Sequence, residues 1–270
     1  MRRRTLAPRG IILGVLGACL AGAALAQSDA RGDFLAGHAK KCQSCDLQGQ
    51  SFRDRDLKRA RLDKASLAGA DFAGATLFRA TLQHADLTGA LLSEVDMDKI
   101  DAKWAVLKNA KMNDTLLFEA DLSAADLSGA DLSRARMGSA RLTQADLRGA
   151  ILVGVDLRGA RLAGAKFEGA NMRGATLDGQ NLREADLHGV ALEAADMIEA
   201  DLTGANLAGA KLAGVDFTRA DLHGADLRGA DLAGANLQFA ILTDALTDGA
   251  VFDGAIMPDG KRGEQAPKAP

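Results

Sequence analysis

The hydrophobic positions of this chain recur every five residues from residue 45 to residue 257. Positions whose numbers end in 2 or 7 carry Leu, Phe or Met almost throughout, and positions ending in 5 or 0 carry mostly Ala. The segments 130–134 (Ala-Asp-Leu-Ser-Arg) and 205–209 (Ala-Asn-Leu-Ala-Gly) are typical, and the unit repeats about 43 times without a frame shift. Such a short and persistent period indicates a repeat protein in which each unit packs mainly against its neighbours.

A period of five fits neither a helix, with 3.6 residues per turn, nor a long strand, with a period of two. Either would scatter the central apolar residues over several faces. The pattern instead predicts four short extended segments joined by four corners, which return every central residue to one interior in coils of 20 residues. Stacking at the roughly 4.8 Å spacing of paired strands predicts ten or eleven coils and a rod roughly 50 Å long.

The residue types at each position agree with this geometry. The central Leu, Phe or Met fills the axis, and the Ala two positions earlier is small because it also points inward. Gly occupies the corner, two positions after the centre, in about half of the units, as at Gly149 and Gly154. A type II turn needs a positive φ there, which glycine adopts without strain. Where Arg, Glu or Gln stands at the corner, we expect a different turn type.

The repeating A-(D/N)-L-x-x unit resembles that of the pentapeptide repeat family over about four-fifths of the chain. The resemblance implies an all-β fold, a right-handed quadrilateral β-helix. It implies no catalytic activity and no cofactor.

Residues 1–26 have the features of a bacterial export signal. Four arginines among the first nine residues precede the apolar run Ile11–Leu25, and residues 24–26 form a small-x-small cleavage site. The run is too short and too rich in Gly and Ala for a membrane span. We expect a periplasmic or secreted protein without a transmembrane span in its mature form. The alternative is a lipid-anchored envelope protein, because residues 16–19 resemble a lipobox that would place lipid on Cys19.

Both ends of such a rod expose unpaired backbone and need caps. We expect residues 27–44 to form an N-terminal cap, with a short helix within residues 29–41. The repeat solenoid then spans residues 45–257. Pro258 cannot donate the next ladder hydrogen bond and should stop the solenoid, leaving residues 258–270 as a disordered tail.

The spacing Cys42-x-x-Cys45 is the one chemically suggestive motif. In an exported protein these cysteines predict a structural disulfide. A redox role is the alternative, as is a metal site with His38, but the sequence shows no surrounding βαβ pattern and no further ligands.

The repeat is irregular between residues 91 and 119, where apolar residues take positions that usually carry Asp or Asn. One interpretation is a locally repacked coil, with Trp104 folded over the gap left by Ala102. The other is a protein-binding surface, because exposed apolar residues that cluster call for an explanation. With a period of 20, Phe78, Phe118 and Ile198 fall on one side of the coil, with Leu116 beside Phe118. Together with Trp104 of the irregular segment, these residues form the candidate partner surface.

The last coil carries apolar residues in the same outward position on all four sides: Ile241, Leu246, Val251 and Ile256. Either the tail or a second copy of the chain should cover this ring. DNA-mimicking members of the pentapeptide repeat family dimerise through their C-terminal ends, so by resemblance we expect a C-terminal homodimer.

Composition narrows the function. The formal charge is −3, and without residues 1–26 the chain holds 29 basic and 36 acidic residues, a charge of −7. This balance, with one Trp and no Tyr, argues against a nucleic-acid partner.

The sequence shows no set of catalytic, cofactor-binding or metal-binding residues. It therefore predicts a non-enzymatic structural or protein-interaction scaffold of the bacterial cell envelope with an unknown protein partner. The alternative, by resemblance, is a DNA-mimicking inhibitor of gyrase.

Overall fold

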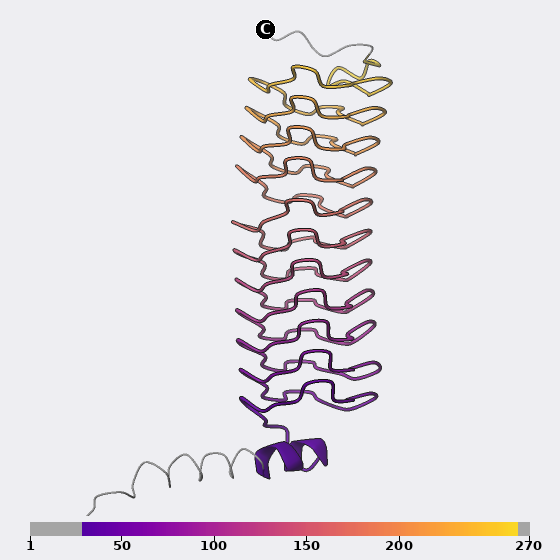
Figure 1. Cartoon of the computed structure of the whole chain (residues 1–270). Helices are drawn as coiled ribbons and strands as arrows, with labels where there is room; N and C mark the ends of the chain where they lie inside the picture. The colour runs from indigo at the N-terminus through magenta and orange to yellow at the C-terminus, as the bar shows by residue number, and fades with distance from the viewer. Residues whose placement is uncertain (1–28, 264–270) are drawn as a thin grey trace, which may run out of the picture.

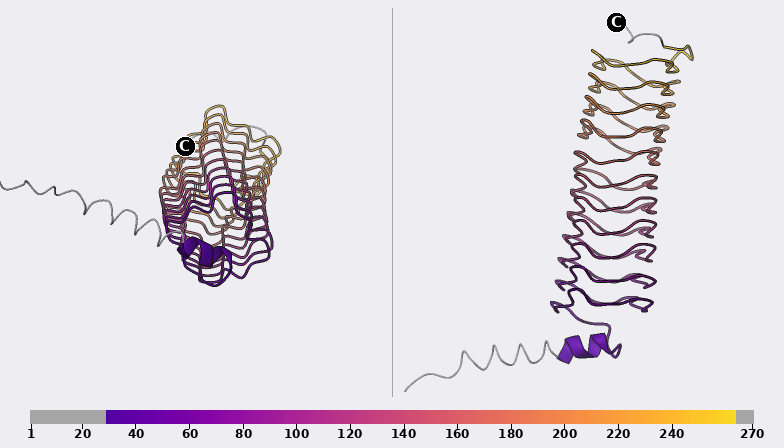
Figure 2. Two further views of the ribbon diagram at one scale, coloured as in Figure 1. Left: turned by 60° about the horizontal axis from the view of Figure 1, so that its bottom comes forward. Right: turned by 45° about the vertical axis from the view of Figure 1, so that its right-hand side comes forward.

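A computed structural model describes residues 29–263, which form one short helix followed by a straight, four-sided rod (Figure 1). Within the rod there are no long strands. Single residues whose numbers end in 1 or 6 form parallel β-bridges to the residue 20 positions later, from Lys41↔Arg61 to Asn236↔Ile256, except at Arg161 and Lys166. Each coil therefore contains 20 residues, as the five-residue period predicts. Figure 2 shows the coils superposed around one axis, with the helix across the N-terminal end.

Two kinds of backbone hydrogen bond hold the coils. Neighbouring coils are joined by bonds such as Leu132 N–H to Ile151 O, at 2.7 Å, and Asp131 N–H to Ala110 O, at 3.0 Å. Within each side, a turn closes by a bond such as Ala135 N–H to Leu132 O, at 3.0 Å. These bonds pair the backbone N–H and C=O groups over nearly every coil. No polar side chain is therefore needed in the interior to bond them, and the interior can be apolar.

The predicted core is confirmed. The central residues and the alanines two positions before them are buried along the rod, as at Leu132 and Ala130. They form one continuous apolar column from Phe34 at the N-terminal end to Ala255 at the C-terminal end. The positions on either side of each centre remain at the surface.

The corners share one backbone feature. All corner residues from Ser44 to Gly254 have a positive φ, and 22 of them are not glycine, with φ between +54° and +63°. The positive φ expected for the glycine corners therefore also holds at the non-glycine corners, and a different turn type there stays a prediction. The corner N–H is tied to the next coil, as in the 2.8 Å bond from Arg134 N–H to Val153 O, and this bond fixes the same left-handed backbone for any side chain. Relative to glycine, the cost is about 1 kcal/mol at each such corner.

The N-terminal helix spans residues 29–35 and closes one end of the axis. Phe34 is fully buried, with its ring edge-on to Phe52 at 5.7 Å, and Phe52 stacks on Phe72 at 5.0 Å. Arg55 donates hydrogen bonds to the carbonyls of Phe34, at 2.7 Å, and Leu35, at 3.4 Å. A cation at a helix C-terminus stabilises the unpaired carbonyls there, so Arg55 fixes the cap.

The C-terminal end is closed in part by a hairpin, which corrects the expectation of a disordered tail beginning at residue 258. Met257 N–H donates to Lys261 O at 2.7 Å, and Gly263 N–H donates to Ala255 O at 2.7 Å. Gly263 is buried, and a side chain there would approach the Met257 sulfur to 2.9 Å, so glycine permits the close contact. Pro258 lies in the hairpin turn, where no ladder bond is required of it. Residues 264–270 lie outside the described residues.

Candidate protein-interaction surfaces

The structure places only part of the predicted partner surface together. Phe78, Phe118 and Ile198 lie in one column, as expected from the 20-residue coil. Ile198 is four coils beyond Phe118 and half-buried, and Trp104 lies on the adjacent side of the rod. Leu116 and Phe118 share one side of one coil and line one depression, which we call the Phe118 groove.

The Phe118 groove is a surface hollow of about 610 Å³ on one side of the rod. Phe118 is 44% exposed, and its ring leans over Gly138 of the next coil. A Cβ atom at Gly138 would lie 3.4 Å from the Phe118 ring, at ordinary contact distance, so the ring packs directly over this residue. Half-buried Leu116 continues the apolar floor. The remaining lining residues are polar: Asp98, Arg136, Ser139, Asp156 and Arg158.

Charges around the groove are only partly neutralised. Arg158 forms two hydrogen bonds to the Asp156 carboxylate, at 2.9 and 2.7 Å. Asp98 accepts a 2.7 Å hydrogen bond from Phe118 N–H, and burial nevertheless raises the pKa of this carboxyl. Arg136 forms no ion pair among the described residues, but its positive charge favours the ionised form of Asp98 and Asp156, which line the same groove. The groove therefore combines an apolar floor with a polar rim of mixed charge, which suits an apolar side chain of a partner.

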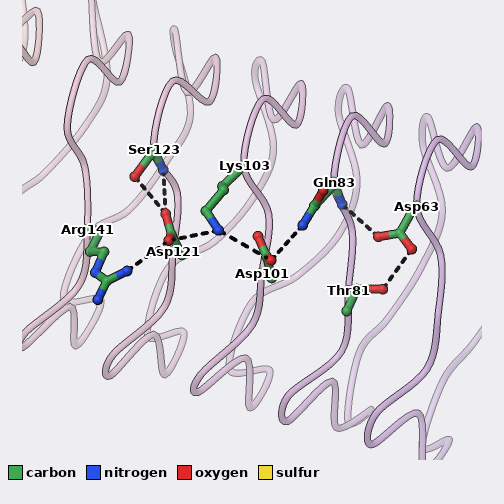
Figure 3. Close-up of polar contacts among 8 residues, drawn as sticks. All are labelled: Asp63, Thr81, Gln83, Asp101, Lys103, Asp121, Ser123 and Arg141. Carbon is green, nitrogen blue, oxygen red and sulfur yellow. Dashed lines mark hydrogen bonds and ion pairs between the residues drawn. The ribbon is translucent and has the colours of Figure 1, made fainter.

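The adjacent side of the rod carries Trp104. A ladder of polar side chains runs along the same side (Figure 3). Trp104 is 49% exposed and stacks on His84 of the preceding coil, with ring centres 4.9 Å apart. It therefore does not fold over the Ala102 position as one interpretation expected. The polar ladder links five successive coils through the side chains Asp63, Thr81, Gln83, Asp101, Lys103, Asp121, Ser123 and Arg141.

Asp121 is the most heavily bonded member of this polar ladder. It accepts hydrogen bonds from Ser123 N–H at 3.1 Å and Ser123 O–H at 2.6 Å, and it pairs with Lys103 at 3.3 Å and Arg141 at 3.4 Å. Burial pushes the pKa of Asp121 upward, but the bonds from Ser123 and Lys103 outweigh it and hold the pKa below its ordinary value.

We expect the Asp121→Asn substitution to lower the free energy of unfolding at pH 7 by about 1–3 kcal/mol, because bonds to a carboxylate are lost. A lowered pKa in the folded state stabilises the protein above the unfolded pKa of about 3.9 and ceases to do so as the pH falls through the folded pKa. The difference between variant and wild type should thus shrink between pH 5 and pH 2 in urea titrations. Asp253→Asn, at an exposed aspartate, is the control. A pH-independent difference would contradict the proposed role of the Asp121 charge.

Most aspartates before a central Leu serve the turn that follows. The Oδ1 atom of Asp126 accepts the Ser128 N–H at 2.9 Å, and Asp231 accepts the Ala233 N–H at 3.0 Å. Arg148 and Arg228 each form a fork on the aspartate two residues earlier. The carboxylates are therefore bonded locally, and several are neutralised, which weakens the negative field of the rod.

The apolar ring of the last coil is largely uncovered. Ile241, Leu246 and Val251 are 48%, 47% and 42% exposed, and only Ile256 is partly covered, where it bridges to Arg262 of the hairpin. Beside the ring, the corner residue Phe239 is 61% exposed. The sequence pattern alone could have indicated it, as the one Phe at a corner. Several backbone N–H groups on this edge have no acceptor among residues 29–263: Leu242, Asp244, Thr247, Gly249 and Phe252.

Cys42 and Cys45 are both buried and close together, with their sulfur atoms at disulfide distance and their Cα atoms 5.3 Å apart. Residues 1–26, including Cys19, lie outside the described residues. Within residues 29–263 there is no helix long and apolar enough to cross a membrane. In the same range, no three His, Cys, Asp or Glu side chains gather as a metal site would require.

Comparisons with known proteins agree on the fold. The family model described as pentapeptide repeats matches in eight copies between residues 41 and 259. HetL, a pentapeptide repeat protein involved in heterocyst differentiation regulation in the cyanobacterium Nostoc, is 31% identical over 84% of this chain and 95% of its own, with a TM-score of 0.39. The fluoroquinolone resistance protein QnrB1 is 17% identical over 78% of this chain and 92% of its own, with a TM-score of 0.43.

A pentapeptide repeat protein of the Arabidopsis thaliana thylakoid lumen is 29% identical over 56% of this chain and 74% of its own, with a TM-score of 0.21. No curated protein matches. The family match confirms the predicted right-handed quadrilateral β-helix, and pentapeptide repeat proteins are generally structural or interaction proteins. The eight repeat matches and the identity to HetL show that the chain belongs to the pentapeptide repeat family.

Proposed function

We propose that this protein is a non-enzymatic protein-binding scaffold of the bacterial cell envelope and that the Phe118 groove is its partner contact. The observation that carries the proposal is the exposed Phe118 ring, which lies with Leu116 in a hollow rimmed by charged side chains. Interface hot spots are typically aromatic anchors surrounded by a polar rim. A rigid rod holds such an anchor at low entropic cost.

The envelope location rests on the export features of residues 1–26 and on the bonded cysteines of the cap, since disulfides persist in oxidising compartments. Intact mass of the protein purified from fractionated host cells tests it. A chain that begins at Gln27, or at a lipidated Cys19, supports export, and alkylation without reductant should leave Cys42 and Cys45 unmodified. A full-length cytoplasmic chain would overturn this location.

The Phe118→Asp substitution should abolish partner capture from the periplasmic fraction, with at least a tenfold loss in pull-down yield. The substitution removes the apolar contact of the ring and places a carboxylate against the apolar surface of the partner. Ile198→Asp is the matched control, because it lies in the same column four coils away. Equal capture by wild type and Phe118→Asp would remove the Phe118 groove from the proposal.

We further propose that the uncovered ring of the last coil is the contact of a C-terminal homodimer. Three apolar side chains and a row of unpaired N–H groups lie at one end of the rod. A second copy, related by a two-fold axis, would bury both kinds of group at once.

The alternative of gyrase inhibition finds less support in the charge distribution. A phosphate mimic needs carboxylates that are free to face the enzyme. In this rod, an arginine two residues later forms an ion pair with each of Asp146, Asp156 and Asp226. A supercoiling assay with the purified mature chain tests it directly. Protection of gyrase against a fluoroquinolone would favour inhibition over the scaffold.

A further inference from the structure

Two successive coils separate along two of their four sides, between residues 159 and 190. The bridges Arg161↔Asn181 and Lys166↔Asp186, which the 20-residue period requires, are absent, although their neighbours Asp156↔Thr176 and Asn171↔Ala191 are present. Seven inter-coil N–H groups lose their acceptors among the described residues. They are Gly159, Leu162, Gly164, Phe167, Gly169, Asn181 and Asp186.

The separation opens a cleft of about 820 Å³ that reaches the core. Its apolar walls are formed by Leu162 and Phe167 of one coil and Leu182 of the next. Ala165 and Ala185, which stand in inward positions, are only half-buried, whereas most inward alanines of the rod are fully buried. Figure 1 shows the wider step between coils on one side of the rod. We call this the inter-coil cleft.

The inter-coil cleft begins at Gln180, a large polar residue in an inward position that usually carries Ala. Gln180 is 3% exposed, and its side-chain amide donates a 2.5 Å hydrogen bond to the Leu157 carbonyl of the preceding coil. Thr115 also replaces an inward Ala, but its small hydroxyl bonds to Leu92 O and Met112 O while the ladder around it stays closed. We attribute the opening to the greater length of the Gln180 side chain.

We propose that the inter-coil cleft is a docking site for an extended peptide that inserts as an additional strand. One wall offers the N–H groups of Leu162, Gly164 and Phe167. The facing wall offers the carbonyls that these groups would otherwise bond, those of Asn181, Arg183 and Asp186. A second backbone presents donors and acceptors to both edges at once, whereas a purely apolar ligand would leave them unpaired.

The side chains of the cleft define which peptide fits. The interior accepts small and branched apolar residues against Leu162 and Leu182. The rim is of mixed charge: Arg161 and Lys166 lie there with Glu168, Glu184 and Asp186, and none of these five forms an ion pair among the described residues. The apolar interior and the two backbone edges therefore decide which peptide fits. This site is separate from the Phe118 groove and does not depend on it.

A phage-displayed library of random 12-residue peptides, selected on the chain without residues 1–26, tests the proposal. We expect enriched peptides that bind wild type at least tenfold more tightly than Gln180→Ala, because alanine restores the usual residue and closes the cleft. Thr115→Ala and Phe118→Asp should bind like wild type. Absence of enriched peptides, or equal binding by Gln180→Ala, overturns the docking site.

Hydrogen exchange provides a readout that needs no peptide. In the free wild type, the amides of Leu162, Gly164 and Phe167 should exchange at least tenfold faster than those of Leu142 and Gly149. Both of these control amides donate hydrogen bonds to carbonyls of the next coil. Gln180→Ala should slow them, and a selected peptide should slow them in wild type. Protection of these amides in the free wild type would show a closed cleft and overturn the proposal even if Phe118 still binds a partner.

Discussion

Replacing Phe52 with alanine is expected to destabilise the N-terminal end of the rod by about 3–5 kcal/mol. Phe52 is fully buried between Phe34 of the helix and Phe72 of the next coil, with ring centres 5.7 and 5.0 Å away. Its truncation removes apolar burial and leaves a cavity that the backbone ladder prevents from collapsing. The guanidinium of Arg55, which lies 5.6 Å from the Phe52 ring, would also lose its support under the helix.

Urea unfolding followed by circular dichroism and by the fluorescence of Trp104, the only tryptophan, measures this effect. Phe239→Ala is the matched control, since that ring is 61% exposed and its loss should change the stability by less than about 0.5 kcal/mol. Because repeat proteins can unfold in parts, proteolysis of the helix before the rod would also be expected. If Phe52→Ala lowers the free energy of unfolding no more than Phe239→Ala does, the result contradicts the proposed role of the aromatic stack.

The triple substitution Ile241→Asp, Leu246→Asp and Val251→Asp should convert the proposed C-terminal dimer into a monomer. Each aspartate would bring an unpaired charge into a contact that is apolar on both copies, and burial of an unpaired charge costs several kcal/mol. We expect the dissociation constant to rise at least 100-fold, or about 3 kcal/mol. The cap of the N-terminal end is remote from these positions, so the fold should persist.

Sedimentation velocity over a range of concentrations measures the oligomeric state. Ile151→Asp is the control, because Ile151 holds the same outward position of its unit, is 41% exposed and lies in the body of the rod. A monomeric wild type at high concentration would reject the homodimer and leave the ring without this role.

The core and the coil length were predictable because they depend on a strict period. A Leu such as Leu132 returns to the same interior every five residues only in a four-sided coil, so sequence pattern and backbone geometry impose the same answer. The column of Phe78, Phe118 and Ile198 followed from the same period, which placed these residues on one side. The same period places Trp104 on another side, but it did not reveal that Ile198 is half-buried, since burial depends on neighbouring side chains.

The sequence by itself determined the five-residue repeat, the all-β coil, the inward alanines and the need for caps at both ends. Only the tertiary structure decided which surfaces lie open. The shared left-handed corners arise because bonds to the next coil override the preference of each side chain. The hairpin at residues 257–263 forms because free donors at the rod end capture it, and the inter-coil cleft forms because Gln180 is too long for an alanine position. Such outcomes depend on contacts between residues about 20 positions apart, which a local pattern of five does not contain.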